Sequence, residues 1–125
     1  MWQKLLWLSI AGAGGTLLRY GMSGMVQRMH DGTFPWGTLA VNCLGCFLFG
    51  VAEAFAAERS LISSETRTVV LIGFMGAFTT FSTFAFETSQ MLGDSQWAFA
   101  ALNAIGQTIL GLAFIFLGLA AGRLV

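Results

Sequence analysis

Long apolar segments alternate with short polar ones along this 125-residue chain. The apolar segments cover about residues 5–27, 36–57, 68–92 and 97–123. The polar segments between them lie at about 27–33, 58–67 and 93–96. Each apolar segment is close to the ~20 residues that an α-helix needs to cross the hydrocarbon core of a bilayer. The pattern therefore predicts an all-α membrane protein, with a single domain of four transmembrane helices over residues 1–125.

The composition supports this prediction. Hydrophobic residues make up 56% of the chain, charged residues only 10%, and the mean hydropathy is +0.75. A soluble domain is about one quarter charged. Six basic and six acidic side chains cancel to a net charge of zero, which argues against a nucleic-acid-binding protein. No nucleophile–base pair, phosphate-binding loop or metal-ligating cluster suggests an enzyme.

The third apolar segment mixes glycine, hydroxyl and aromatic residues at the expected centre of the bilayer. Gly76 weakens a helix, and the hydroxyls of Thr79 and Thr80 compete for helical hydrogen bonds. We therefore predict a break in the helix near residues 76–79. Broken backbone at this depth must be buried in protein or face a cavity. Its free carbonyls can hold a cation, and the start of the next half-helix presents N–H groups to an anion.

Polar and aromatic residues near this break are candidates for an ion pathway. Phe81 and Phe84 are three residues apart and share a helix face, and Ser82 and Thr83 add hydroxyls. Phenylalanine edges carry partial positive charge, so these groups and the amide of Asn42 suit a small dehydrated anion. The alternatives remain open at this point: the rings are packing residues, and Asn42 forms a hydrogen bond between helices.

The basic residues predict a weak orientation in the membrane. With four spans, one side holds Lys4, Arg59, Arg67 and Arg123, and the opposite side holds Arg28 and, at most, Arg19. Because this difference is small, the positive-inside rule favours cytoplasmic termini only slightly. Insertion in both orientations is then expected, and its natural product is an antiparallel homodimer.

Small residues also recur at four-residue spacing, which lets helices approach closely in a membrane. They are Cys46, Gly50 and Ala54 in the second segment, and Gly118 and Gly122 in the fourth. We interpret these rows as surfaces for self-association, with packing inside one subunit as the alternative. Cys43 and Cys46 form a C-x-x-C pair, but two thiols on a membrane helix are interpreted as packing residues.

The sequence strongly resembles the bacterial fluoride channel family over essentially its whole length. The resemblance rests on Gly37-Thr38-Leu39 with Asn42, on the segment from Gly76 to Phe84 followed by Glu87, and on the glycine-rich first segment leading to Leu18-Arg19-Tyr20. It implies an antiparallel, dual-topology homodimer in the bacterial inner membrane, with two separate pores that export fluoride passively.

The resemblance also implies roles for individual residues. Phe81, Phe84 and Asn42 would line the pores, with Ser82 and Thr83 in a hydroxyl track. Arg19 would face an aqueous vestibule, and Thr38 and Glu87 match polar positions near the ion pathway. The backbone carbonyls of Gly76 and Thr79 would bind a structural Na⁺ at the dimer centre.

The chain departs from the family pattern at three positions. Ala77 and Phe78 stand where the family usually has glycine and leucine, and Gln107 stands where it usually has serine. Two other functions remain as alternatives. A small proton-coupled multidrug exporter needs a carboxylate in the first span, where this chain has Arg19. A non-conducting structural subunit of a membrane complex is the other.

Overall fold

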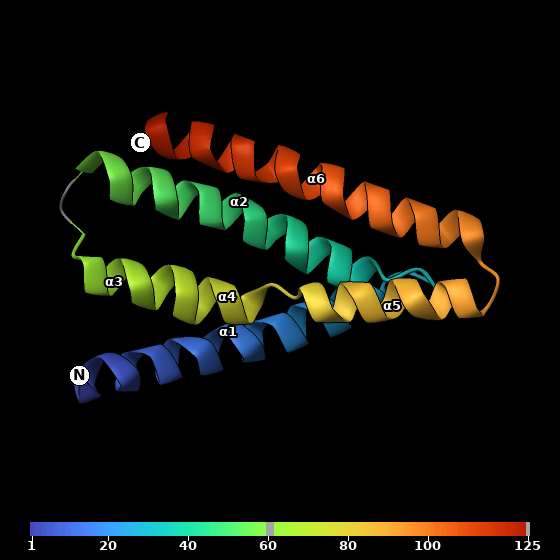
Figure 1. The fold of residues 1–125 in the computed structure, drawn as a ribbon, viewed down its shortest axis with the longest axis horizontal. Coiled ribbons are helices and arrows are strands. Elements are labelled where there is room, and N and C mark those ends of the chain that lie inside the picture. Colours follow the sequence, from blue (N-terminus) through green and yellow to red (C-terminus); the bar gives the residue numbers. More distant parts are fainter. Residues whose placement is uncertain (60–61, 125) are drawn as a thin grey trace.

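The computed structural model describes residues 1–59 and 62–124, and this part of the chain is helical almost throughout. The helices form four long rods that run back and forth (Figure 1). The rods are α1 (Trp2–Arg28), α2 (Trp36–Arg59), a third rod composed of α3 (Ser64–Thr68), η1 (Val69–Met75), α4 (Gly76–Phe78) and α5 (Phe81–Gly93), and α6 (Trp97–Leu124). The predicted all-helical fold is therefore confirmed.

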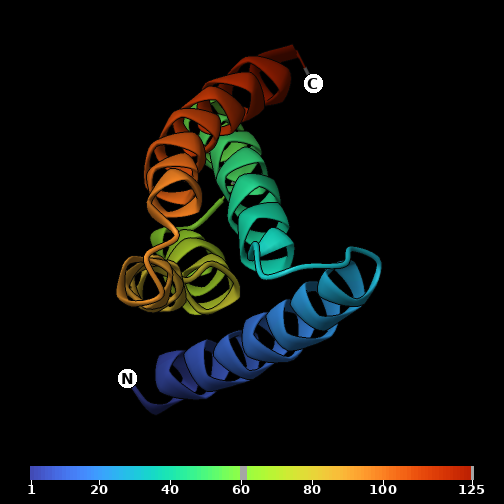
Figure 2. The same cartoon turned by 90° about the vertical axis from the view of Figure 1, so that its right-hand side faces the viewer.

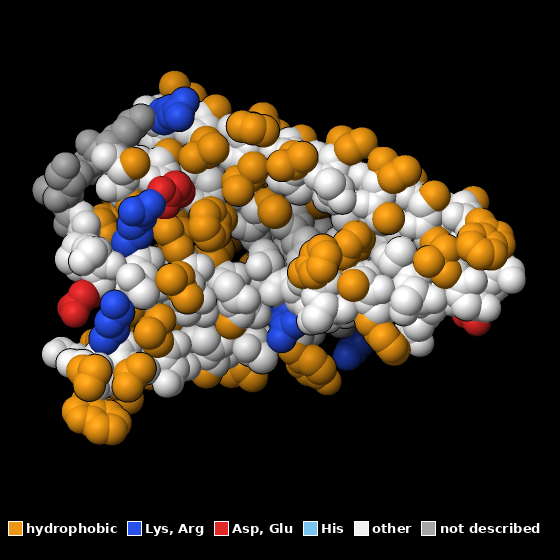
Figure 3. Space-filling model, in the orientation of Figure 1, with side chains coloured by type: hydrophobic (Ala, Val, Ile, Leu, Met, Phe, Trp, Pro, Cys, Tyr) orange, Lys and Arg blue, Asp and Glu red, His pale blue; other side chains and the backbone are white. Residues whose placement is uncertain are grey.

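Three of the rods in the described part of the chain are long and apolar enough to cross a membrane. They cover Trp36–Ala57, Ser64–Gly93 and Trp97–Leu124. The first rod, α1, has 27 residues but is less apolar, since it contains Lys4 and Arg19. On the face shown in Figure 3, hydrophobic side chains are spread along the whole length of the molecule, whereas charged side chains lie mainly toward one end.

The connection between α2 and the third rod is shorter than predicted. Residues 64–67, which the hydropathy pattern assigned to a loop, form the start of a helix. Ser63 caps this helix, because its hydroxyl accepts a hydrogen bond from the backbone N–H of Thr66 at 3.1 Å. Residues 60–61 of the predicted loop lie outside the described residues. An ion pair between Arg67 and Glu53 joins the two helices at this end.

Small residues bring α2 and α6 into close backbone contact. A Cβ atom added to Gly50 would collide with the carbonyl of Ile115, and one added to Gly118 would collide with the carbonyl of Phe47. A Cβ atom on Gly122 would lie 2.7 Å from the carbonyl oxygen of Val51. Our interpretation of these rows as surfaces for self-association is therefore wrong. They are used inside the subunit, since small residues let two helices of one chain approach closely.

A second close approach joins α1 to the third rod. Gly15 is buried, and a Cβ atom there would collide with the carbonyl of Phe74 in η1. A Cβ atom on Gly73 of η1 would lie 3.2 Å from side-chain atoms of both Leu8 and Ala11 of α1. Viewed from the end, α1 and α6 lie on opposite sides of the bundle (Figure 2). These contacts fix the first half of the third rod, which ends in the middle of the molecule.

Candidate functional site

Two extended residues, Thr79 and Thr80, interrupt the third rod near its middle (Figure 1). Thr79 has φ −84° and ψ 159°, and Thr80 has φ −148° and ψ 110°. The Thr80 hydroxyl caps the following helix by accepting a hydrogen bond from the backbone N–H of Thr83 at 3.2 Å. The predicted break is confirmed. We predicted it near residues 76–79, and it lies at Thr79 and Thr80.

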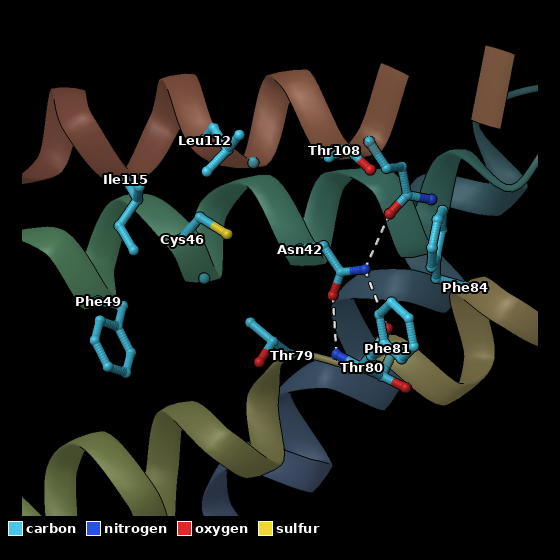
Figure 4. Close-up of a pocket in the computed structure, with 13 residues that line it drawn as sticks. Asn42, Cys46, Phe49, Thr79, Thr80, Phe81, Phe84, Thr108, Leu112 and Ile115 are labelled. Atoms are coloured by element: carbon cyan, nitrogen blue, oxygen red, sulfur yellow. Dashed lines mark hydrogen bonds between the residues drawn. The ribbon is translucent and has the colours of Figure 1, made fainter. Parts of the chain in front are cut away.

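Asn42 of α2 binds both backbone polar atoms of Thr80 (Figure 4). The Thr80 N–H donates to Asn42 Oδ1 at 2.9 Å, and Asn42 Nδ2 donates to the Thr80 carbonyl at 3.1 Å. Asn42 Nδ2 also donates to Gln107 Oε1 of α6 at 3.0 Å. Asn42 therefore forms the hydrogen bonds between helices that we left open as an alternative, and it satisfies backbone groups that the break would otherwise leave unpaired.

The break also removes the usual donors from two backbone carbonyls. In a continuous α-helix, the N–H of Thr80 would donate to the Gly76 carbonyl, and the N–H of Thr83 would donate to the Thr79 carbonyl. Here the first N–H donates to Asn42 and the second to the Thr80 hydroxyl. The carbonyl oxygens of Gly76 and Thr79 have therefore lost their helical donors, and Gly76 lies exposed at the surface of the chain.

A cavity of about 470 Å³ lies beside the break, between α2, α5 and α6. We call it the central cavity. Its lining residues are Asn42, Gly45, Cys46, Phe49, Thr79, Thr80, Phe81, Phe84, Gln107, Thr108, Gly111, Leu112 and Ile115. The rings of Phe81 and Phe84 lie with their centroids 5.5 Å apart and are tilted by 48°. The prediction that they share a helix face is confirmed, and Phe81 is 78% exposed in the single chain.

A second cavity, of about 490 Å³, lies on the side of α1 and contains the guanidinium-bearing Arg19. We call it the Arg19 cavity. It is lined by Thr16, Arg19, Tyr20, Ser23, Gly24, Gln27, Thr38, Val41, Thr80 and Thr83. Thr80 thus lines both cavities. Thr80 is therefore the one residue that the two described linings share.

A carboxylate lies close to the Arg19 cavity without lining it. The buried hydroxyl of Thr38 donates to Glu87 Oε1 of α5 at 2.7 Å. Glu87 Oε2 is buried and has no hydrogen-bond partner among the described residues. One oxygen of this carboxylate is therefore available to a further donor.

The structure brings most of the predicted site residues to one of the two cavities. Phe81, Phe84, Asn42 and Thr79 line the central cavity, whereas Arg19, Thr38 and Thr83 line the Arg19 cavity. Ser82 and Gly76 line neither. The Ser82 side chain is exposed, with its hydroxyl 3.4 Å from that of Thr80.

Sequence reasoning missed Asn103 and assigned no role to Thr80 in lining the site. Asn103 is completely buried on α6 and accepts a hydrogen bond from Gln107. The spacing of these two amides by four residues on an uncharged span was the available signal, since residues four apart share a helix face. Cys43 and Cys46 are free thiols, and the described residues contain no metal-ligating cluster of histidine, cysteine and acidic side chains.

The chain is similar to known proteins over most or all of its length. The family described as "CrcB-like protein, Camphor Resistance (CrcB)" matches residues 6–119. A protein of Nitrosococcus oceani named fluoride-specific ion channel FluC is 60% identical over 125 residues, which is the full length of both chains. A protein of the same name from Solidesulfovibrio magneticus is 53% identical over the full length of both chains. Another from Nitratidesulfovibrio vulgaris is 51% identical over 98% of this chain and 99% of its own length.

Proposed function

Since this chain belongs to the CrcB-like family of membrane proteins, we propose that it is a fluoride-specific ion channel that exports fluoride passively. The resemblance noted in the sequence is confirmed at the level of the family, whose curated relatives are named as ion channels and not as enzymes. The observation that carries the proposal is the break at Thr79–Thr80, because it places two phenylalanine rings beside a cavity in the middle of the molecule.

The chemistry of the central cavity supports conduction of a small anion. Its lining combines the rings of Phe81 and Phe84 with amide and hydroxyl groups, and none of the described residues that line it is charged. Aromatic edges and an uncharged donor replace part of the water that a halide loses, without holding it as tightly as a fixed positive charge. The amide of Asn42 and the threonine hydroxyls of this lining already donate to protein acceptors, so the two rings and the second N–H of Gln107 would contact the ion. Such weak sites let an ion enter and leave.

The driving force needs no coupled ion and no nucleotide. Hydrogen fluoride is a neutral weak acid that crosses membranes and ionises in the less acidic cytoplasm, where the anion is trapped. A channel lets this anion leave down its electrochemical gradient. Arg19 would attract fluoride into its cavity, and the exposed Ser82 and the pair of Thr38 and Glu87 would lie near the route.

The proposed assembly is an antiparallel, dual-topology homodimer with two pores in the bacterial inner membrane. The near balance of basic residues on the two sides supports insertion in both orientations. The high exposure of Phe81 supports a partner that covers this ring. In this assembly α1 is the fourth transmembrane helix, because neighbouring protein shields its less apolar residues from lipid.

The residues at the break fit a structural Na⁺. The carbonyl oxygens of Gly76 and Thr79, which have lost their helical donors, would hold it, and a two-fold axis would double their number. Hard cations prefer oxygen ligands, and unwound backbone in membrane proteins supplies them. The ion would join the two broken helices of a dimer and would take no part in moving the anion.

A flux measurement tests the proposed function. Proteoliposomes loaded with fluoride should release it to a fluoride electrode, and the same vesicles loaded with chloride should not. Phe81→Ile and Phe84→Ile should abolish the release, whereas Phe86→Ile is the matched control, since this exposed ring of α5 lines neither cavity. Normal fluoride release from both cavity variants would contradict the assigned pathway.

No observation favours either alternative function, the proton-coupled multidrug exporter or the structural subunit. A proton-coupled exporter needs a carboxylate in α1, and this helix contains none. A structural subunit would not need cavities that meet at the break of a transmembrane helix.

A further inference from the structure

Four side chains of α2, α5 and α6 form one continuous line of hydrogen bonds at the wall of the central cavity, and the line ends on the backbone of Thr80. Asn103 Nδ2 donates to the hydroxyl of Thr88 at 2.9 Å, and Gln107 Nε2 donates to Asn103 Oδ1 at 2.8 Å. Asn42 Nδ2 donates to Gln107 Oε1 at 3.0 Å and to the Thr80 carbonyl at 3.1 Å. The line therefore runs from Thr88 of α5 through α6 and α2 to Thr80, which is the residue directly before α5.

The line closes into a ring on the half-helix that carries the two phenylalanines. The Thr88 hydroxyl donates to the Phe84 carbonyl at 2.8 Å, so both ends of the line lie on the backbone of residues 80–84. Phe81 and Phe84 lie within this bracketed segment. We call the set Thr80, Thr88, Asn103, Gln107 and Asn42 the amide ring.

The amide ring has one direction of donation, which fixes the orientation of each carboxamide. Asn42 Oδ1 must accept from the Thr80 N–H, so Nδ2 faces the Thr80 carbonyl and Gln107. Gln107 must then present its oxygen to Asn42 and its nitrogen to Asn103. Asn103 is 0% exposed and Gln107 is 8% exposed, so the hydrogen bond between these two amides is shielded from water.

We propose that Gln107 and Asn103 are positioning residues for ion conduction, because they hold Asn42 and the first two turns of α5 in the arrangement that presents Phe81 and Phe84 to the central cavity. This inference rests on the proposed function. Gln107 is the central member of the ring, since it alone connects Asn42 of α2 to Asn103. Removing its amide frees one N–H of Asn42 and lets the start of α5 shift.

The test measures fluoride release from vesicles reconstituted so sparsely that most hold a single channel or none. In this regime, misfolding lowers the fraction of vesicles that release fluoride, whereas misplacement of the rings lowers the rate in the vesicles that do. Gln107→Met keeps the length of the side chain and removes both hydrogen bonds. Gln90→Met is the matched control, because it makes the same change at an exposed position of α5 that lines neither cavity.

We expect Gln107→Met to slow fluoride release by about tenfold. This factor corresponds to raising the barrier to conduction by the free energy of one or two hydrogen bonds in a membrane. The releasing fraction should stay unchanged, and Gln90→Met should behave as the parent protein. Asn103→Leu should slow release by several-fold, and the double variant should be no slower than Gln107→Met alone, because both changes open the same ring.

Three results would overturn the inference. An unchanged rate in Gln107→Met would show that the amide does not act on conduction. A lower releasing fraction with a normal rate would show that it serves folding only. Multiplied effects in the double variant would show that the two amides act separately. If Gln107→Met fails to insert, Asn103→Ser opens the ring at its neighbouring member, and the rate of fluoride release is measured in the same way. Failure of the proposed function looks different, since the parent protein itself would then release no fluoride.

Discussion

Asn42 and Thr80, which are 38 residues apart in the sequence, are joined by two hydrogen bonds between one carboxamide and the backbone of one residue. The carboxamide gives Thr80 the acceptor and the donor that a continuous helix would have supplied. The break is thereby stabilised from outside the third rod, by a residue of α2. This relationship makes the geometry of the break sensitive to a single side chain.

Asn42→Ala should lower the free energy of unfolding by about 2 kcal/mol, the sum of a few membrane hydrogen bonds of ~0.6 kcal/mol each and the cost of the unpaired Thr80 groups. It should also abolish fluoride release. Denaturation in mixed micelles measures the first effect. Thr108→Val is the control for stability, because the Thr108 hydroxyl only bonds to the Ala104 carbonyl of its own helix. Equal stability of the two variants would be evidence against the role of Asn42.

Gly45→Ala should destabilise the break by about 1–3 kcal/mol, because the added methyl group would collide with the Thr79 side chain and lie 3.2 Å from the Phe78 ring. Adding Thr79→Ser should restore part of the loss by removing the methyl group that it strikes. Gly106→Ala is the control, since only the far end of the Leu102 side chain lies within reach there. Thermal unfolding checks all three. A stable Gly45→Ala protein would show that α2 can move away from the break.

Gly118→Ala should separate α2 from α6, since its methyl group would collide with the backbone carbonyl of Phe47, which cannot move aside cheaply. We expect a loss of about 2 kcal/mol or more, as for other overpacked sites. Gly111→Ala should be tolerated, because its methyl group would meet only the Cys46 sulfur at 3.5 Å. The melting temperatures of the two variants measure the difference. Equal values would mean that the close contact of the two helices is not needed.

Na⁺ should raise the melting temperature of the protein when it replaces K⁺ or a large organic cation at constant ionic strength and constant chloride. A ligand that binds only the folded state stabilises it in proportion to the logarithm of its concentration. The effect should therefore keep growing with the logarithm of the Na⁺ concentration once this concentration exceeds the dissociation constant of the site. Identical melting temperatures in all three cations would contradict the proposed site at Gly76 and Thr79.

The sequence predicts the long helices well, because the lengths of the apolar runs decide where a membrane helix begins and ends. The break was predicted because Gly76, Thr79 and Thr80 all weaken a helix locally. The π-helical form of residues 69–75 was not predicted, since hydrophobic composition does not distinguish it from an α-helix. The partners of Asn42 were not predicted either, because they depend on which helices become neighbours in three dimensions.

The rows of small residues in α2 and α6 also show that the sequence does not identify which helices become neighbours. Spacing alone indicated that Gly50 and Gly118 would each face a helix. Only the fold showed that they face each other's helices within one subunit. A pattern of small residues reports close packing but does not identify the partner.

Thr80 lines both cavities, and its hydroxyl also caps α5 by accepting a hydrogen bond from the Thr83 N–H. A rotation of this buried side chain would therefore uncap the half-helix that carries Phe81 and Phe84. Thr80 thus ties the shape of both cavities to the start of α5, so that one substitution at this position would alter all three together.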